Sequence, residues 1–103
     1  MTHFGLHGRF NAQPGKRQEL VDILLEAAAL MEAAQGCELY VVSTTEDNDA
    51  VWVTEIWRTE IDHDASLRVP GVPELIKRAR PLTAGAPESM RLVVHGGKGL
   101  GRR

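Results

Sequence analysis

The chain has 103 residues and a mass of 11.3 kDa, which is the size of a single domain with one hydrophobic core. Twelve Lys and Arg residues against fourteen Asp and Glu residues give a net charge of −2, so the composition offers no basic surface for nucleic acid or an anionic membrane. The single cysteine, Cys37, excludes an internal disulfide and any CxxC redox or zinc motif. Since the first residues lack the pattern of a signal peptide and no stretch has transmembrane length, we expect a cytoplasmic protein.

The first part of the chain predicts a strand followed by a helix. Apolar and polar residues alternate over residues 3–11, and Gly5 and Gly8 leave gaps where another group can approach closely. Residues 16–35 predict an amphipathic helix, because apolar side chains recur every three or four positions. Gly36 stands where a helix C-cap is expected.

Two further strands are predicted over residues 38–44 and 51–58, joined by the polar loop 45–49. Both strands carry large apolar side chains on both faces, as Trp52 and Val53 do at adjacent positions. An antiparallel sheet with one face in water would alternate apolar and polar residues instead. The pattern therefore indicates a sheet that is covered on both faces.

The next stretch predicts a helical region that is broken near Pro70-Gly71. One helix is expected over residues 60–68 and a second over residues 74–80. Pro73 suits the first turn of the second helix, where its missing N–H has no intrahelical partner to lose. Pro81 ends that helix.

One domain is expected over residues 1–95, ending in a strand at 89–95 and followed by a flexible Gly- and Arg-rich tail at 96–103. The order β-α-β-β-α-β specifies an α+β ferredoxin-like sandwich, in which helices cover one face of a four-stranded antiparallel sheet. The other apolar face then needs cover from another molecule. A homodimer that packs sheet against sheet meets this need, because its two surfaces are self-complementary.

The histidines and the cysteine predict neither a metal site nor a nucleophile. His3 and His7 would lie about 13 Å apart along a strand, too far to share one metal ion. Cys37 follows the expected helix end, where the helix dipole raises the pKa of a thiol. We expect it to be a small buried hydrophobic residue.

Trp57 and His63 are the residues that best fit a catalytic site. Trp57 lies on the same face of its strand as Glu55, and His63 follows six residues later across the turn into the helix. The two side chains can therefore line one pocket, where a histidine can take or give a proton near neutral pH. The same residues also suit structural roles, with Trp57 in the core, His63 bonded to backbone at a helix start, and Glu55 in an ion pair.

Three short motifs have the order and spacing of a known family: Pro14-Gly15-Lys16 before the first helix, Gly36-Cys37-x-x-Tyr40 at the second strand, and Glu55-x-Trp57 at the end of the third. Over residues 4–95 the chain resembles the antibiotic biosynthesis monooxygenase (ABM) family. The resemblance implies a dimeric ferredoxin-like fold. It also implies an oxygenase activity, since the family includes cofactor-independent quinol and polyketide-tailoring monooxygenases and haem-degrading oxygenases.

The resemblance to the tailoring enzymes implies roles for particular residues. In these enzymes the phenolic substrate itself reduces O₂ after losing a proton, and the protein supplies an apolar pocket and a proton acceptor. Trp57 would be the pocket tryptophan and His63 the residue that contacts the substrate, so these two are the expected catalytic residues. One of the three cations Lys77, Arg78 and Arg80 would stabilise an anionic substrate. The residues expected to bind substrate are Val53, Ser66, Leu67, Ile76 and Arg80.

The chain also departs from parts of the family. Gly8, Ser66 and Ile76 occupy the positions of the Asn, Trp and His of the haem degraders, so we expect neither haem degradation nor a resident cofactor. Many members have a His where this chain has Ser66, and some tailoring enzymes have an Asn where it has Val53.

The predicted function is a monooxygenase that oxidises a small aromatic, quinol- or polyketide-like substrate with O₂. The alternatives are a non-catalytic ligand-binding dimeric module and an isomerase- or decarboxylase-type enzyme on the same scaffold.

Overall fold

The computed structural model describes residues 2–47 and 49–100. Among these residues no helix has the length and apolar character needed to span a bilayer. Short 3₁₀ helices lie at Met31–Ala33 and Arg80–Leu82. The main elements are β1 (His3–Asn11), α1 (Arg17–Leu30), β2 (Cys37–Thr44), β3 (Ala50–Trp57), α2 (Glu60–Ser66), α3 (Val72–Ala79) and β4 (Glu88–Val94).

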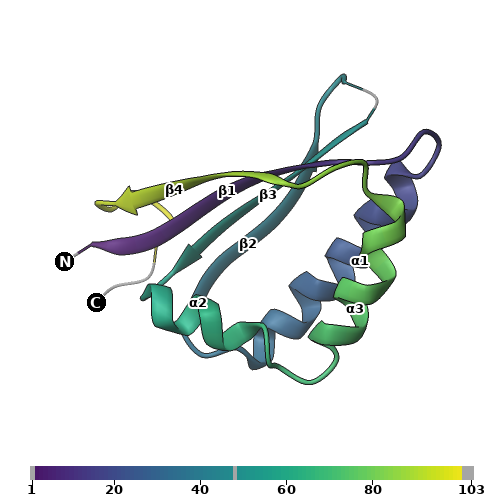
Figure 1. Ribbon diagram of the computed structural model, residues 1–103. Coiled ribbons are helices and arrows are strands. Elements are labelled where there is room, and N and C mark those ends of the chain that lie inside the picture. The colour runs from purple at the N-terminus through teal and green to yellow at the C-terminus, as the bar shows by residue number, and fades with distance from the viewer. Residues whose placement is uncertain (1, 48, 101–103) are drawn as a thin grey trace.

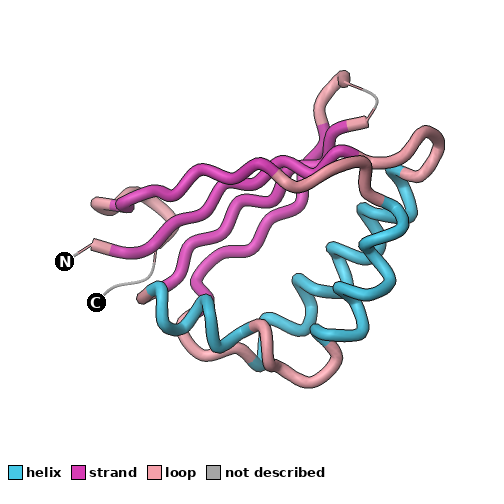
Figure 2. Tube along the Cα trace, in the orientation of Figure 1, coloured by secondary structure: helices cyan, strands magenta, loops and turns pink. Residues whose placement is uncertain are grey.

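The strands of the described chain form one antiparallel sheet in the order β2-β3-β1-β4. The helices α1, α2 and α3 all lie on the same side of this sheet (Figure 1), as the tube drawing in the same orientation also shows (Figure 2). This is the α+β ferredoxin-like fold that the element order predicts, and each strand boundary agrees with the sequence prediction to within one residue. Residues 101–103 of the expected tail and residue 48 of the expected loop lie outside the described residues.

The first helix is shorter than its sequence pattern predicts. It ends at Leu30 and tightens into the 3₁₀ turn, and Ala34 is already extended, with φ −91° and ψ 124°. Gly36 has φ +82°, the left-handed conformation expected of a glycine that ends a helix, although it follows this turn rather than the α-helix itself. The apolar pattern continues past the helix because the side chains of the turn still pack inward, as buried Met31 does.

The break predicted near Pro70-Gly71 is confirmed, because α2 ends at Ser66 and α3 begins at Val72. Gly71 has φ +97° and is the N-cap residue of α3. A Cβ atom at this position would lie 3.0 Å from Cδ1 of Leu30, so glycine also allows α3 to approach the end of α1.

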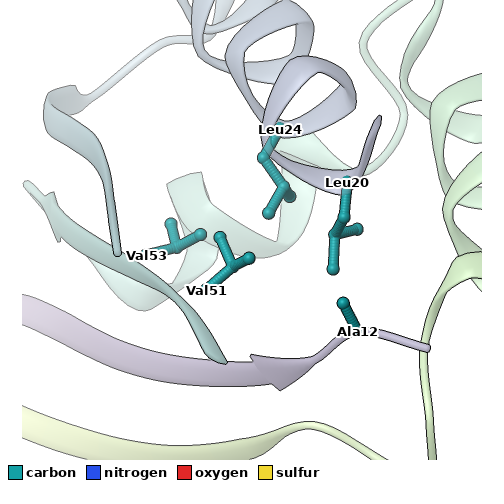
Figure 3. Close-up of a cluster of buried hydrophobic side chains, with 5 residues drawn as sticks. All are labelled: Ala12, Leu20, Leu24, Val51 and Val53. Atoms are coloured by element: carbon teal, nitrogen blue, oxygen red, sulfur yellow. The ribbon is translucent and has the colours of Figure 1, made fainter. Parts of the chain in front are cut away.

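One cluster of buried apolar side chains joins α1 to the sheet. Its members point toward one another from the helix, from β3 and from the residue just after β1 (Figure 3). Burial of one such large side chain contributes about 1.5–3 kcal/mol to folding, so this cluster fixes α1 on the sheet. The members are Ala12, Leu20, Leu24, Val51 and Val53.

A second cluster surrounds Trp57, which has no exposed surface. Met31 and Val72 are its other buried members, so it ties the end of β3 to the turn after α1 and to the start of α3. Tyr40 packs against both clusters and therefore lies where they meet.

The face of the sheet opposite the helices stays open in the described chain. Val41 and Met90 on this face are 43% and 59% exposed. Gly5 of β1 leaves room for a side chain of the neighbouring strand β4, because a Cβ atom at Gly5 would lie only 2.8 Å from Cγ2 of Val94. Two rows of directly paired residues cross this outer face: Leu39, Ile56, Gly5 and Leu92, and Val41, Thr54, His7 and Met90.

Candidate active site

A cavity of about 480 Å³ lies between the inner face of the sheet and the helices. Its volume is typical of sites for small organic ligands, and its walls are mostly apolar side chains from β1, α1 and α3. A few polar side chains also line it, which is the usual composition of a site that orients a ligand. The polar side chains are Tyr40, Glu55, His63, Ser66, Arg80 and Thr83.

Glu55 is placed on the floor of this cavity by the pairing of the strands. It lies directly opposite Leu6 of β1 and, on its other side, opposite Tyr40 of β2. Directly opposed residues of antiparallel strands share a face of the sheet. Glu55 is therefore a carboxylate on the same inner face as buried Val53 and Trp57.

Trp57 holds both Glu55 and His63 in position. Its indole Nε1–H donates a hydrogen bond of 2.9 Å to Oε1 of Glu55, and Nε2 of His63 lies 3.9 Å from the same oxygen. The His63 ring lies against Phe4 and Trp57, with ring centroids 5.6 Å and 5.7 Å away. The imidazole is thus held beside the carboxylate, at a distance longer than a hydrogen bond.

A second carboxylate contacts the other nitrogen of His63. Nδ1 lies 2.9 Å from Oδ1 of Asp64, whose side chain is exposed. When Nδ1 carries the proton and donates it to Asp64, Nε2 is the unprotonated nitrogen, and it faces Glu55. The arrangement can therefore accept a proton from a bound ligand and connects the acceptor to an exposed carboxylate.

Burial controls the ionisation of the acidic groups on the cavity floor. It raises the pKa of Glu55 above the ordinary value of 4.5, and the hydrogen bond from Trp57 and the nearby His63 oppose this rise. Burial also raises the pKa of Tyr40, and the neighbouring Glu55 and Cys37 add to the rise. The Tyr40 phenol therefore keeps its proton at neutral pH.

A family model for antibiotic biosynthesis monooxygenases matches residues 3–78, which is most of the chain. The chain belongs to the ABM family. Among curated proteins no match to the sequence was found. Among solved structures, the chain is similar to a candidate antibiotic biosynthesis monooxygenase from Chloroflexus aurantiacus J-10-fl, with 41% identity, a TM-score of 0.88, and coverage of 96% of this chain and 99% of that one.

More distant solved structures share the fold. A candidate antibiotic biosynthesis monooxygenase from Caulobacter crescentus CB15 is 22% identical with a TM-score of 0.80, covering 88% of each chain. SnoaB, a cofactor-independent oxygenase from Streptomyces nogalater, is 15% identical with a TM-score of 0.80, covering 95% of this chain and 98% of that one. At these identities the likeness is evidence of a common ABM architecture.

Most of the residues expected to form the site surround one cavity in this ABM fold. His63, Ser66, Leu67, Ile76 and Arg80 all line it. Two expected residues do not. Val53 is 1% exposed within the first core cluster, and Trp57 lies behind Glu55 and His63 with its surface fully covered.

The three cations of which one is expected near the substrate, Lys77, Arg78 and Arg80, differ in their position relative to the cavity. Arg80 lines the cavity. Arg78 instead points away to Glu26, with which it makes two hydrogen bonds of 3.2 Å and 3.0 Å. Lys77 is exposed and is not part of the cavity lining. Arg80 is therefore the one of the three that a ligand in this cavity can contact.

Glu55 and Tyr40 line the cavity, although the sequence pattern assigned a ligand to neither. Glu55 is the one charged residue on a strand face that otherwise carries Val51, Val53 and Trp57. That charge among apolar neighbours is the signal that could have identified it. Tyr40 gives no comparable signal, because its inward direction depends on the pairing of β2 with β3.

The cysteine and the two early histidines are not part of the cavity lining. The pKa of Cys37 is raised, as the sequence predicts, but burial is the main cause and the charge of Glu55 the next. His3 and His7 lie on the outer face of β1. His3 Nε2 is 3.2 Å from Oε1 of Glu38, and His7 Nδ1 is 3.0 Å from Oγ1 of Thr54.

Replacing Glu55 by glutamine should change how folding stability depends on pH. Because its pKa is raised in the folded state, the folded state holds the proton more tightly than the unfolded state does. The free energy of unfolding of the wild type therefore falls as the pH rises from 4.5 through the raised pKa. Glutamine does not ionise, and its amide oxygen can still accept the Trp57 N–H. In urea titrations the stability of E55Q relative to wild type should increase towards neutral pH.

The His63 imidazole lies beside Glu55 and can itself carry a charge, so the comparison needs a matched background. The wild type and E55Q should therefore also be compared with His63→Gln present in both, which removes the imidazole from each protein. The stability difference should still grow towards neutral pH in this background. A difference between E55Q and its parent that stays constant with pH would contradict the burial of an ionisable Glu55.

Proposed function

We propose that this protein is a cofactor-independent monooxygenase that oxidises a small aromatic, quinol- or polyketide-like substrate with O₂. The observation that carries the proposal is an acid–base pair, His63 and Glu55, on the wall of an apolar cavity of about 480 Å³. Membership of the ABM family supports it. The cofactor-independent oxygenase SnoaB on the same fold gives further support.

The proposed reaction begins when a ring CH₂ group activated by a neighbouring phenol or carbonyl gives a proton to Nε2 of His63. The resulting carbanion passes one electron to O₂, and the two radicals combine to form a C–O bond. Protonation gives a hydroperoxide, which loses the second proton of the carbon while the O–O bond breaks. One oxygen atom remains as a carbonyl and the other leaves as water, so the four electrons that O₂ accepts all come from the substrate.

The groups around the cavity suit these steps. Glu55 beside His63 stabilises the imidazolium formed in the first step, since an opposite charge favours the protonated ring. Asp64 on Nδ1 connects that ring to solvent, where the proton can leave. Arg80 on the cavity wall contacts the anionic form of the substrate in this proposal.

A second candidate function uses the same acid–base pair without O₂. An isomerase or decarboxylase also needs one group that takes a proton from carbon and returns it, and His63 with Asp64 can do so. The two candidates differ in whether product formation requires O₂.

The test is O₂ consumption by the chelator-treated protein with a panel of hydroquinones and anthrones, without added flavin or metal. The proposal expects one O₂ consumed for each anthrone converted to anthraquinone, with no change on addition of catalase. Products formed equally without O₂ would instead support the isomerase or decarboxylase function. A ligand that raises Tm and is recovered unchanged would support a binding module.

The proposal includes a homodimer that packs sheet against sheet. The exposed apolar residues of the outer face, such as Val41, Met90 and Leu92, are available for this contact. A twofold dimer would cover them with the same surface of a second copy. The cytoplasmic location expected from the sequence also remains part of the proposal.

A further inference from the structure

Three hydroxyl groups line the cavity, those of Tyr40, Ser66 and Thr83. Ser66 Oγ donates to the carbonyl oxygen of His63 over 2.5 Å, and Thr83 Oγ1 donates to that of Arg80 over 2.9 Å. No hydrogen bond joins the Tyr40 hydroxyl to any of residues 2–47 or 49–100. Tyr40 is thus the cavity hydroxyl whose proton remains available within the described chain.

Tyr40 also lies next to the proposed acid–base pair. It is directly opposite Glu55 in the pairing of β2 with β3, so the Cβ atoms of the two residues are about 5 Å apart. Oε1 of Glu55 already accepts the Trp57 N–H. Arg80 belongs to the other end of the cavity, near Thr83, which bridges to Ala12 after β1. Leu6, which faces Glu55, and Ala12 are six positions apart in sequence, which corresponds to about 20 Å along a strand.

A substrate that loses a proton to His63 becomes an anion in an apolar cavity, where an oxygen without a hydrogen bond is strongly destabilised. We propose that the Tyr40 hydroxyl donates a hydrogen bond to the substrate oxygen that carries this charge. The proposal rests on the proposed function for its substrate class, a phenol or an enolisable ketone. It makes Tyr40 a residue that contacts the substrate and stabilises its anion.

The charged and titratable groups that face this position come from several elements. Glu55 from β3 and Cys37 from β2 are the neighbours that affect the Tyr40 phenol, and His63 from α2 lies beside Glu55. Arg80 is the cation on the cavity wall. A substitution that removes only the Tyr40 hydroxyl leaves all four groups in place, so it isolates the contribution of that hydroxyl.

The test uses alizarin, an anthraquinone that is already oxidised and whose absorbance reports the ionisation of its phenol. Bound alizarin is titrated in the wild type and in Tyr40→Phe, which keeps the ring and its packing. Ser66→Ala and Thr83→Val are matched controls, because their hydroxyls donate to the protein. We expect the ionisation constant of bound alizarin to be about tenfold smaller in Y40F than in wild type, as a charge-assisted hydrogen bond is lost. The two controls should remain close to wild type.

Equal ionisation constants of bound alizarin in wild type and Y40F would overturn the inference. A change in S66A or T83V as large as that in Y40F would also overturn it, and so would failure of alizarin to bind the wild type. The experiment involves no O₂, so it separates this inference from the proposed function. If Y40F shows the expected change while no substrate consumes O₂, the role of Tyr40 stands and the oxygenase proposal fails. If O₂ is consumed but bound alizarin ionises equally in Y40F and wild type, the oxygenase proposal stands and the role of Tyr40 fails.

Discussion

Replacing His63 by glutamine should lower the kcat of substrate oxidation by about 10²–10⁴-fold, the usual contribution of a positioned general base. Nε2 of His63 is the proton acceptor in the proposed reaction, and the ring lies against Phe4 and Trp57 with its Nδ1 next to Asp64. Glutamine keeps a polar side chain of similar length but cannot take a proton. The loss should appear mainly in kcat, since most of the apolar cavity wall that binds the substrate is unchanged.

His95→Gln is the matched control for this substitution, because His95 is exposed beyond β4 and is not part of the cavity lining. Its turnover should equal that of the wild type. Trp57→Phe should lower turnover as well, since it removes the N–H that holds Glu55, without removing a cavity-lining group. Unchanged turnover in both H63Q and W57F would show that the catalytic roles are assigned to the wrong residues.

Replacing Leu92 by glutamate should convert the proposed dimer into a monomer. Leu92 is on the outer face of β4, in the row with Gly5 and Ile56, and is 36% exposed. Because the proposed interface is twofold, this one substitution places two carboxylates in an apolar contact, one from each copy. An unpaired buried charge costs about 3–5 kcal/mol. The dissociation constant should therefore rise by more than about 100-fold, measured by sedimentation equilibrium over a range of protein concentrations.

Val93→Glu is the control for the dimer experiment. Val93 is the next residue of the same strand, is 67% exposed and pairs with Phe4 on the inner face, so a charge there does not enter the proposed interface. V93E should sediment as the wild type does, and circular dichroism should show that both variants are folded. A wild type that is monomeric at micromolar concentration, or a V93E that dissociates as readily as L92E, would be evidence against a sheet-to-sheet dimer.

The elements of the fold follow from local patterns, and the sequence was sufficient to predict them. The alternation in β1 and the three- and four-residue spacing in α1 are properties of neighbouring residues, and a proline and a glycine mark the break before α3. The end of α1 was predicted less well, because apolar residues continue through a 3₁₀ turn that has a similar inward face. The order of the elements then leaves few arrangements, of which the ferredoxin-like sheet is the observed one.

The sequence by itself therefore determined the fold class and the presence of apolar residues on both faces of the sheet, and it indicated His63 as a candidate pocket residue. Only the tertiary structure decided which polar groups share that pocket. The register between β2 and β3 turns Tyr40 toward Glu55, and the turn after α3 brings Arg80 rather than Arg78 to the cavity. Spacing along the chain does not encode these choices, because they depend on contacts between segments far apart in sequence.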